Sequence, residues 1–166
     1  RGFRDVLILG RQKRYETYDL HMIKPEPLVP REQIFEVSER VSYEGEVLTP
    51  MDTGELAEAI AAVAEGGYDA VAVAFLHAYA NPAHERAVGD ALRARLPGVA
   101  LSLSVDVSPK LREYERTNTT VANSFVKPLV GEYVRRLSES FAGMGASAEL
   151  SICLLYTSPS PRDTNP

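Results

Sequence analysis

Features that mark several common protein classes are missing from this sequence. Its 166 residues include a single cysteine, Cys153, so neither an internal disulfide nor a zinc site of several cysteines can form. No run reaches the roughly 18 apolar residues that a membrane-spanning helix needs. The formal net charge is -5, whereas nucleic-acid-binding proteins usually carry a basic surface. We therefore expect a globular α/β domain that has neither a membrane nor nucleic acid as a partner.

The common catalytic and nucleotide-binding motifs are missing as well. The chain has no G-x-x-x-x-G-K-[ST] loop, no G-x-G-x-x-G after a strand and no G-x-S-x-G elbow. Its three histidines, His21, His77 and His84, are not spaced as a ligand pair on a helix turn. A metal site made by His77, His84 and Glu85 is geometrically possible. The favoured interpretation is that the two histidines are simply hydrogen-bonded, so no metal site is predicted.

The two ends of the chain differ from its middle. The first residue is Arg1, with no basic-then-apolar leader, and we expect a segment cut from the interior of a larger protein. Residues 151–166 contain no Ala, Val, Glu or Gly, and residues 153–163 match the translation of a sequencing-library adapter. The natural domain is thus predicted to span residues 1–150, followed by a non-native tail that packs against nothing. A natural Ser/Pro linker is the alternative.

The first fifty residues predict a surface loop and a β-hairpin. Residues 3–9 are too few to distinguish a helix from a strand. Prolines favour extended backbone over residues 11–31. Residues 33–40 alternate as a strand does, residues 43–46 read as a turn, and residues 47–49 form a second short strand.

A helix is predicted directly after this hairpin. Asp52 can cap it, with Glu55 three residues later as in a capping box, and the glycines at 66 and 67 end it. The residues expected to share its inner face are Leu56, Ile60, Ala61 and Ala64.

Strands and helices then alternate. Residues 70–76 form a continuous apolar run, and residues 99–105 alternate between apolar and small polar residues. Between them, Asn81 caps a helix that has Pro82 at its first position. This order predicts a parallel βαβ unit. From residue 108 a long helical pattern follows, and Pro128 predicts two helices or a sharp kink.

The densest polar cluster covers residues 112–120 at the start of that pattern. Glu113 with Arg116, and Arg112 with Glu115, are spaced as surface ion pairs on a helix. The Thr and Asn residues that follow are poor helix formers, which favours the alternative that this segment lines a cleft.

Several motifs together resemble the hydantoinase A/5-oxoprolinase family, in the later part of its N-terminal domain. The resemblance covers residues 1–150 and is carried by these segments: residues 2–7 (GFRDVL), 10–12 (GRQ), 18–20 (YDL), 25–31 (PEPLVPR), 76–85 (LHAYANPAHE), 107–109 (VSP) and 112–117 (REYERT).

The resemblance implies a cytoplasmic, ATP-dependent hydrolase of cyclic amides such as 5-oxoproline or a hydantoin. It implies an actin-like (ribonuclease H-like) ATPase architecture, ATP and Mg²⁺ as cofactors, and a hydantoinase B-type subunit or domain as partner. The family's phosphate-binding segments lie upstream of residue 1, so the chain alone is expected to be inactive. Because some relatives carboxylate ketones instead, the resemblance does not determine which substrate is used. A scaffold or subunit-contact role, with residues 24–31 and the hairpin docking the partner, is the alternative.

Site residues are predicted from the strand ends, because ligands of open α/β sheets gather there. Arg116 is the candidate for holding a phosphate or carboxylate, and Glu115 for orienting it or accepting a proton; these two are predicted to be catalytic. His77, Asn81 and Glu113 are predicted to bind substrate. The alternative is that both carboxylates only form surface ion pairs.

Overall fold

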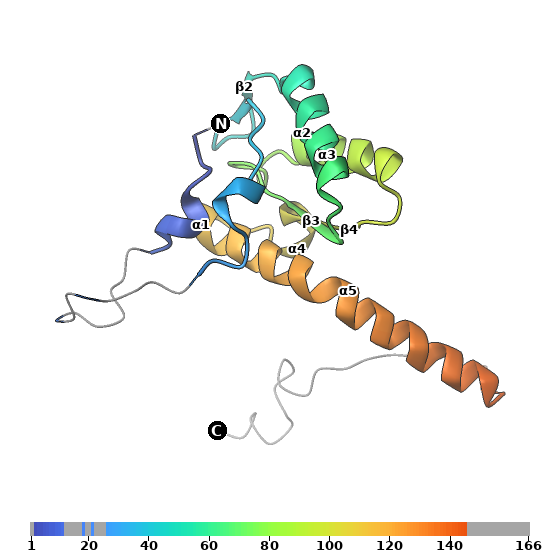
Figure 1. The fold of residues 1–166 in the computed structure, drawn as a ribbon. Helices are drawn as coiled ribbons and strands as arrows, with labels where there is room; N and C mark the ends of the chain where they lie inside the picture. The colour runs from blue at the N-terminus through green and yellow to red at the C-terminus, as the bar shows by residue number, and fades with distance from the viewer. Residues whose placement is uncertain (1, 12–17, 19–20, 22–25, 146–166) are drawn as a thin grey trace, which may run out of the picture. The chain divides into compact units, whose positions relative to one another are not determined.

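The computed structural model of this chain describes residues 2–11, 18, 21 and 26–145 (Figure 1). The chain divides into two compact units, Arg1–Leu129 and Val130–Pro166. The first unit contains every described element except the second half of the last helix. The predicted tail over residues 151–166 lies outside the described residues, and so does much of the predicted loop over residues 11–31.

A parallel βαβ unit forms the centre of the first compact unit, as the sequence predicts. Strands β3 (Ala70–Val73) and β4 (Ala100–Leu103) pair in parallel, with Ala70 opposite Ala100 and Val73 opposite Leu103. Helix α3 (Ala83–Arg95) connects them and packs beside both strands (Figure 1). Both strands end earlier than expected, because the Phe75 N–H donates to a side chain and the short helix α4 (Ser104–Val107) begins directly after β4.

Helix α2 (Thr53–Gly66) begins and ends where the sequence predicts. The Asp52 carboxylate accepts hydrogen bonds from two N–H groups of the first turn, and Gly67 ends the helix in the left-handed conformation. Its buried residues are Leu56 and Val63, whereas the predicted inner residue Ala61 is exposed. A spacing of seven residues brings Leu56 and Val63 to the same face after two turns, which Ala61 does not share.

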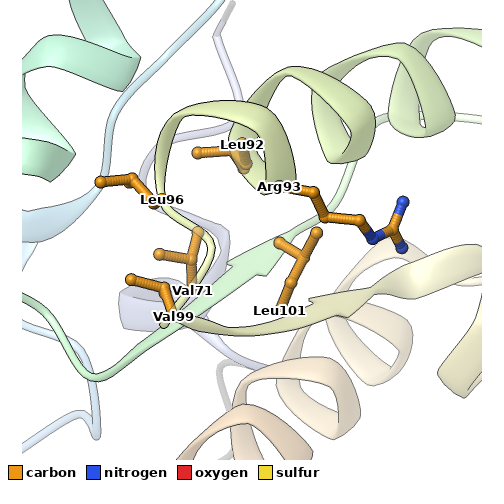
Figure 2. Close-up of a pocket in the computed structure, with 6 residues that line it drawn as sticks. All are labelled: Val71, Leu92, Arg93, Leu96, Val99 and Leu101. Atoms are coloured by element: carbon orange, nitrogen blue, oxygen red, sulfur yellow. The ribbon is translucent and has the colours of Figure 1, made fainter.

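The hydrophobic core lies between α2, α3 and the parallel strands. Its buried members are Val37, Leu56, Val63, Val73, Val88, Leu92 and Leu103. Figure 2 shows the region where α3 meets the two strands, with five apolar side chains and Arg93 around a cavity. The cavity has a volume of about 10 Å³. A cavity of this size holds about one water molecule at most. It is therefore a small packing gap in the core and not a ligand site.

The predicted hairpin is present, but its first strand is much shorter than expected. Strands β1 (Arg40–Val41) and β2 (Val47–Thr49) pair antiparallel, and the 3-10 helix η1 (Arg31–Gln33) replaces the expected strand start. The residues between η1 and β1 are bonded to the start of α2: the Ser38 N–H donates to Glu55, and the Asp52 N–H donates to the Ser38 carbonyl. The strand prediction for residues 33–40 was wrong because a helix terminus satisfies this backbone.

The short N-terminal segment left open by the sequence contains helix α1 (Val6–Leu9). The long helical pattern forms α5 (Glu113–Gly143), which starts after Arg112 and not at Ser108. Pro128 lies inside α5, so the expectation of two separate helices was wrong. Because Pro128 has no N–H, only the carbonyl of Ser124, four residues earlier, lacks its helical hydrogen bond, and the helix tolerates the loss of one bond.

The first half of α5 lies along β4. The Asn123 Nδ2 group donates to Ser102 Oγ at 2.9 Å, and Lys127 Nζ donates to the Leu101 carbonyl at 2.5 Å. The buried residues of α5 are Arg116, Thr120, Val121 and Ser124, a spacing that places them on one face. No helix among the described residues combines the length and apolar character that crossing a bilayer requires.

Candidate functional site

The carboxyl ends of both parallel strands are held by one buried side chain. Glu85, in the first turn of α3, is fully buried and accepts three hydrogen bonds. The donors are the Phe75 N–H after β3 at 2.7 Å, the Ser104 hydroxyl after β4 at 2.6 Å, and the Val105 N–H at 3.1 Å. Burial raises the pKa of Glu85 above its ordinary value, although these hydrogen bonds act in the opposite direction. Glu85 therefore ties the two strand ends together.

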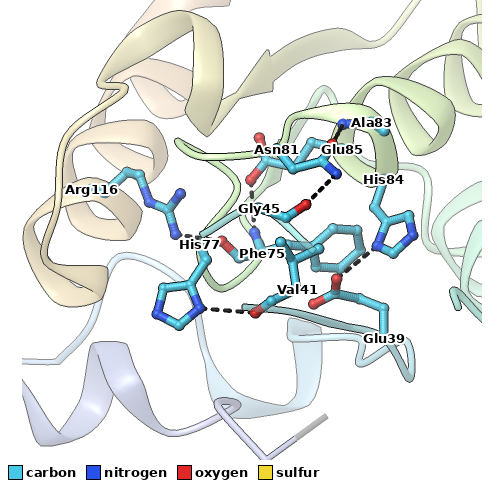
Figure 3. Close-up of polar contacts among 10 residues, drawn as sticks. All are labelled: Glu39, Val41, Gly45, Phe75, His77, Asn81, Ala83, His84, Glu85 and Arg116. Carbon is cyan, nitrogen blue, oxygen red and sulfur yellow. Dashed lines mark hydrogen bonds and ion pairs between the residues drawn. The ribbon is translucent and has the colours of Figure 1, made fainter. Parts of the chain in front are cut away.

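Arg116 bonds to the backbone of the same residue, Phe75, through its carbonyl. Its side chain comes from the first turns of α5, and Nη2 donates to the Phe75 carbonyl (Figure 3). The residue is only 2% exposed, and its guanidinium carbon lies 5.8 Å from the centre of the Tyr79 ring. Burial lowers the pKa of Arg116. Within the described part of the chain, Nε and Nη1 have no hydrogen-bond partner. Buried donors are normally paired, so these two are available to an acceptor.

His77 and Arg116 both contact the ring of Tyr79. The turn after β3 places His77 in the left-handed region, with φ at 55°, which is uncommon for a residue other than glycine. Its Nδ1 donates to the Val41 carbonyl at 2.9 Å (Figure 3). Its ring meets the Tyr79 ring edge-on, with 6.0 Å between the ring centres. His77, Tyr79 and Arg116 thus form one cluster beyond the end of β3. The sequence reasoning did not select Tyr79, although it belongs to the same motif as His77.

Asn81 uses both ends of its amide for structural bonds. Its oxygen accepts from the Ala83 N–H at 3.1 Å, and its Nδ2 donates to the Gly45 carbonyl at 2.8 Å (Figure 3). Pro82 and not Asn81 is the N-cap, so α3 begins one residue later than the sequence predicts. Gly45 has φ at 92°, and a Cβ there would lie 3.3 Å from the Ala80 carbonyl oxygen. Asn81 therefore joins the hairpin turn to the start of α3.

The two predicted glutamates of α5 lie next to α1. Glu115 pairs with Arg11, whose Nη2 lies 2.7 Å from the carboxylate, and Arg112 is 3.9 Å away. The pKa of Glu115 is lowered, first by its own backbone N–H at the helix start and then by Arg11. Glu115 thus forms an ion pair at the surface, with Arg11 as well as with the expected Arg112. The interpretation as a surface ion pair does not apply to Arg116, which is buried and has no ion pair among the described residues.

Glu113 lines an open cavity of about 320 Å³ at this place. The other lining residues are Phe3, Val6, Leu9, Gly10, Arg11 and Tyr114. Of the five predicted site residues, the structure therefore brings His77 and Arg116 together at Tyr79. It places Glu113 and Glu115 beside α1.

The histidines are hydrogen-bonded, as the favoured interpretation expects. His84 Nδ1 lies 2.8 Å from the carboxylate of Glu39, a largely buried pair that connects the segment before β1 to α3 (Figure 3). In the described parts of the chain, no three His, Cys, Asp or Glu side chains are grouped as a metal ion would require.

Comparison with known proteins identifies several relatives. A sequence profile described as "Hydantoinase/oxoprolinase N-terminal region" matches residues 1–96. An uncharacterized protein of Methanocaldococcus jannaschii is 36% identical over 152 residues, which are 92% of this chain and 22% of that protein. Caprolactamase subunit alpha of Pseudomonas jessenii is 33% identical over 138 residues, covering 83% of this chain and 20% of the relative. This chain thus spans about a fifth of the length of each of these two relatives.

Two solved structures are similar in fold. The crystal structure of the ATP-dependent caprolactamase from Pseudomonas jessenii superposes with a TM-score of 0.81 at 32% identity, over 89% of this chain and 22% of that chain. A nucleotide-free acetone carboxylase structure gives a TM-score of 0.66 at 27% identity, over 75% of this chain and 19% of that chain. Because the profile covers more than half of the sequence, and a caprolactamase shares the fold, this chain belongs to the hydantoinase/oxoprolinase family, to its N-terminal region.

Proposed function

We propose that this chain is a part of an ATP-dependent enzyme that opens cyclic amides by hydrolysis, and that it is inactive alone. The observation that carries the proposal is the similarity to the ATP-dependent caprolactamase, which extends over 89% of this chain. That relative is an ATP-dependent caprolactamase. Arg116, a buried cation with two unused donors, is the feature of this chain that suits such chemistry best.

We assign the catalytic roles to Arg116 and Glu115. Hydrolysis of an amide develops negative charge on the amide oxygen, and donors held in a water-poor site stabilise such charge strongly. Nε and Nη1 of Arg116 can supply two N–H groups to that oxygen, or to another anionic group of a reactant. Glu115 remains ionised beside Arg11 and would accept a proton or orient the neighbouring groups.

Substrate binding is assigned to His77, Asn81 and Glu113. Nδ1 of His77 is used by the Val41 carbonyl, so the opposite nitrogen of the ring is the one that can meet a ligand. Asn81 would act by holding the turn that presents His77, since both ends of its amide are bonded. Glu113 would act from the cavity beside α1.

ATP and Mg²⁺ enter the proposal as cofactors of the whole enzyme, and two observations bear on where they bind. The described residues contain no cluster of three His, Cys, Asp or Glu side chains that could hold a metal ion, and the sequence lacks a glycine-rich phosphate loop. We therefore place ATP and Mg²⁺ on parts of an actin-like ATPase domain outside this chain, and we derive no step through them. A hydantoinase B-type partner and a cytoplasmic location complete the proposal, and the name "subunit alpha" of the relative suits a multi-subunit enzyme.

Carboxylation of a ketone is the second candidate function. It is favoured by the similarity to acetone carboxylase, which is smaller in TM-score and in coverage than the similarity to caprolactamase. Both reactions activate a carbonyl group, so the same buried guanidinium would serve either. The two candidate functions are distinguished by which substrate supports turnover.

The test uses a full-length protein that contains this segment. ATP hydrolysis would be measured with caprolactam, 5-oxoproline or hydantoin, and separately with acetone and bicarbonate, for the wild type, Arg116→Lys and Arg116→Ala. We expect lactam-dependent turnover that falls about 100-fold or more in Arg116→Ala, as for loss of an oxyanion donor. Lysine keeps the charge but loses the planar fork, so Arg116→Lys should also be impaired.

Controls separate catalysis from folding. Arg95→Lys, an exposed position on α3, should leave turnover unchanged. Unchanged turnover in both Arg116 variants would support the scaffold alternative, and lost turnover with an equally lowered melting temperature would favour a structural role for Arg116. Turnover with acetone and bicarbonate alone would identify a carboxylase.

A further inference from the structure

The two parallel strands form a sheet that helices contact on both faces. Successive side chains of a strand point to opposite faces, so on β3 Val73 points to one face and Ala72 to the other. The face of Val73 packs against α2 and α3, because Val73 belongs to the core cluster that includes residues of both helices. The other face meets α5, since Ser102, the partner of Ala72 on β4, accepts from Asn123. Parallel sheets are normally enclosed in this way.

The backbone of β3 directs alternate residues to its two sides. In a strand, one residue points both its N–H and its C=O to one side, and the next residue points both to the other side. The Ala100 N–H donates to the Asp69 carbonyl at 3.0 Å, so Asp69 and, two residues later, Val71 point their backbone groups at β4. Ala70 and Ala72 therefore point theirs away from β4. This outward side of Ala70 and Ala72 is the free edge of β3.

The free edge of β3 has no partner within the part of the chain that the structure describes. No backbone or side-chain group there bonds to Ala70 or Ala72 from that side, and both alanines are only half-buried. The outer edge of β4 differs, because its Leu101 carbonyl accepts from Lys127 Nζ. Exposed edges are normally protected by a lysine, a proline or a covering element. Residues 70–74 contain neither a charge nor a proline, so the free edge of β3 lacks this protection.

The sequence of β3 is also that of an inner strand. Residues 70–76 form a continuous apolar run, which is typical of strands inside a parallel sheet. The relatives extend far beyond this region, because this chain spans about a fifth of their length. They therefore have ample further polypeptide that can supply a neighbouring strand.

We propose that the free edge of β3 pairs with a β-strand from a part of the parent enzyme outside these 166 residues. That strand is apolar on both faces, because helices cover both faces of the sheet it joins. Pairing makes β3 an inner strand and fixes the turn at its end, which carries Phe75 and His77. The proposal rests on this chain being part of a larger enzyme, and not on the reaction which that enzyme performs.

Hydrogen exchange at single-residue resolution tests the pairing, because it reads each N–H separately. In this chain, the Ala72 amide should exchange about 100-fold faster or more than the amides of Val71 and Val73, which face β4. In a full-length protein that contains this segment, the Ala72 amide should exchange as slowly as these two neighbours. Val71 and Val73 are matched internal controls, since they lie in the same strand and face β4 in both proteins.

Three results of this measurement would overturn the proposal. The first is an Ala72 amide that still exchanges fast in the full-length protein. The second is protection of Ala72 in this chain that is lost on dilution, because the occupant would then be a second copy of the chain. The third is protection of Ala72 in this chain at every concentration, because the partner would then lie within the 166 residues.

Proline substitutions give a second test. Ala72→Pro removes an N–H that points outward, whereas Val71→Pro removes one that faces β4. Ala72→Pro should therefore lower the melting temperature of this chain much less than Val71→Pro does, but should be as harmful as Val71→Pro in the full-length protein. An Ala72→Pro variant that is equally mild in both proteins would contradict the pairing. If both variants unfold this chain, the exchange of the wild type decides.

Neither test depends on turnover. A full-length protein that opens no lactam, while its Ala72 amide is protected, would refute the proposed function and leave the pairing standing. A full-length protein that opens lactams, while its Ala72 amide exchanges fast, would refute the pairing alone.

Discussion

The backbone of Phe75 is bonded through both its N–H and its carbonyl to ionisable side chains that are almost completely buried. Glu85 accepts from its N–H and Arg116 donates to its carbonyl. The two side chains form no direct ion pair among the described residues, yet the charge of each acts on the pKa of the other. Removing one would leave the other without compensation in a buried place, which is costly. The turn that carries His77 thus depends on both residues.

Replacing Glu85 by Gln tests how much the Glu85 carboxylate contributes to the stability of the fold. The amide keeps one acceptor but turns its NH₂ towards a remaining donor, so the free energy of unfolding should fall by about 1–3 kcal/mol. The loss should depend on pH. Because burial raises the pKa of Glu85 above its ordinary value near 4.5, its contribution is complete below that value and declines as pH rises through the raised one.

The difference in free energy of unfolding between wild type and Glu85→Gln should therefore be largest at acidic pH and should become smaller towards neutral pH. Urea unfolding at a series of pH values measures it, with the exposed Glu58→Gln as control. If the difference instead grows with pH, the three hydrogen bonds lower the pKa of Glu85 by more than its burial raises it.

At the scale of elements, the packing of α3 on β4 depends on one glycine. Gly89 is buried in α3, and a Cβ added there would lie 3.0 Å from Cδ1 of Leu103, a core residue that is 2% exposed. Leu103 has little room to move in a close-packed interior. The approach of α3 to β4 is therefore set by the absence of a side chain at residue 89.

Gly89→Ala should lower the free energy of unfolding by about 1–3 kcal/mol, because overpacking exceeds the gain in helix propensity. The matched control is Gly131→Ala in α5, where a Cβ would meet nothing within 4 Å. That variant should be neutral or more stable by up to about 1 kcal/mol. Denaturant melts of both variants would check this, and a stabilised Gly89→Ala would show that Leu103 repacks.

At the scale of the whole molecule, the boundary at residue 150 is testable. We predict that residues 151–166 do not contribute to the fold, because their composition departs from that of the preceding chain and part of them matches an adapter translation. A chain that ends at Leu150 should have the same melting temperature by circular dichroism as the full sequence. A lower melting temperature would favour the alternative of a natural linker that packs.

The sequence alone determined the features that depend on neighbouring residues. A cap such as Asp52 acts on the next turn of helix, and apolar periodicity predicts the βαβ unit, so both were predictable. Only the tertiary structure decided the rest. The extended residues around Ser38 bond to a helix terminus and not to a strand, and the charge of Arg116 is buried against Phe75, 41 residues away. Local sequence does not specify such partners, because folding brings them together from distant parts of the chain.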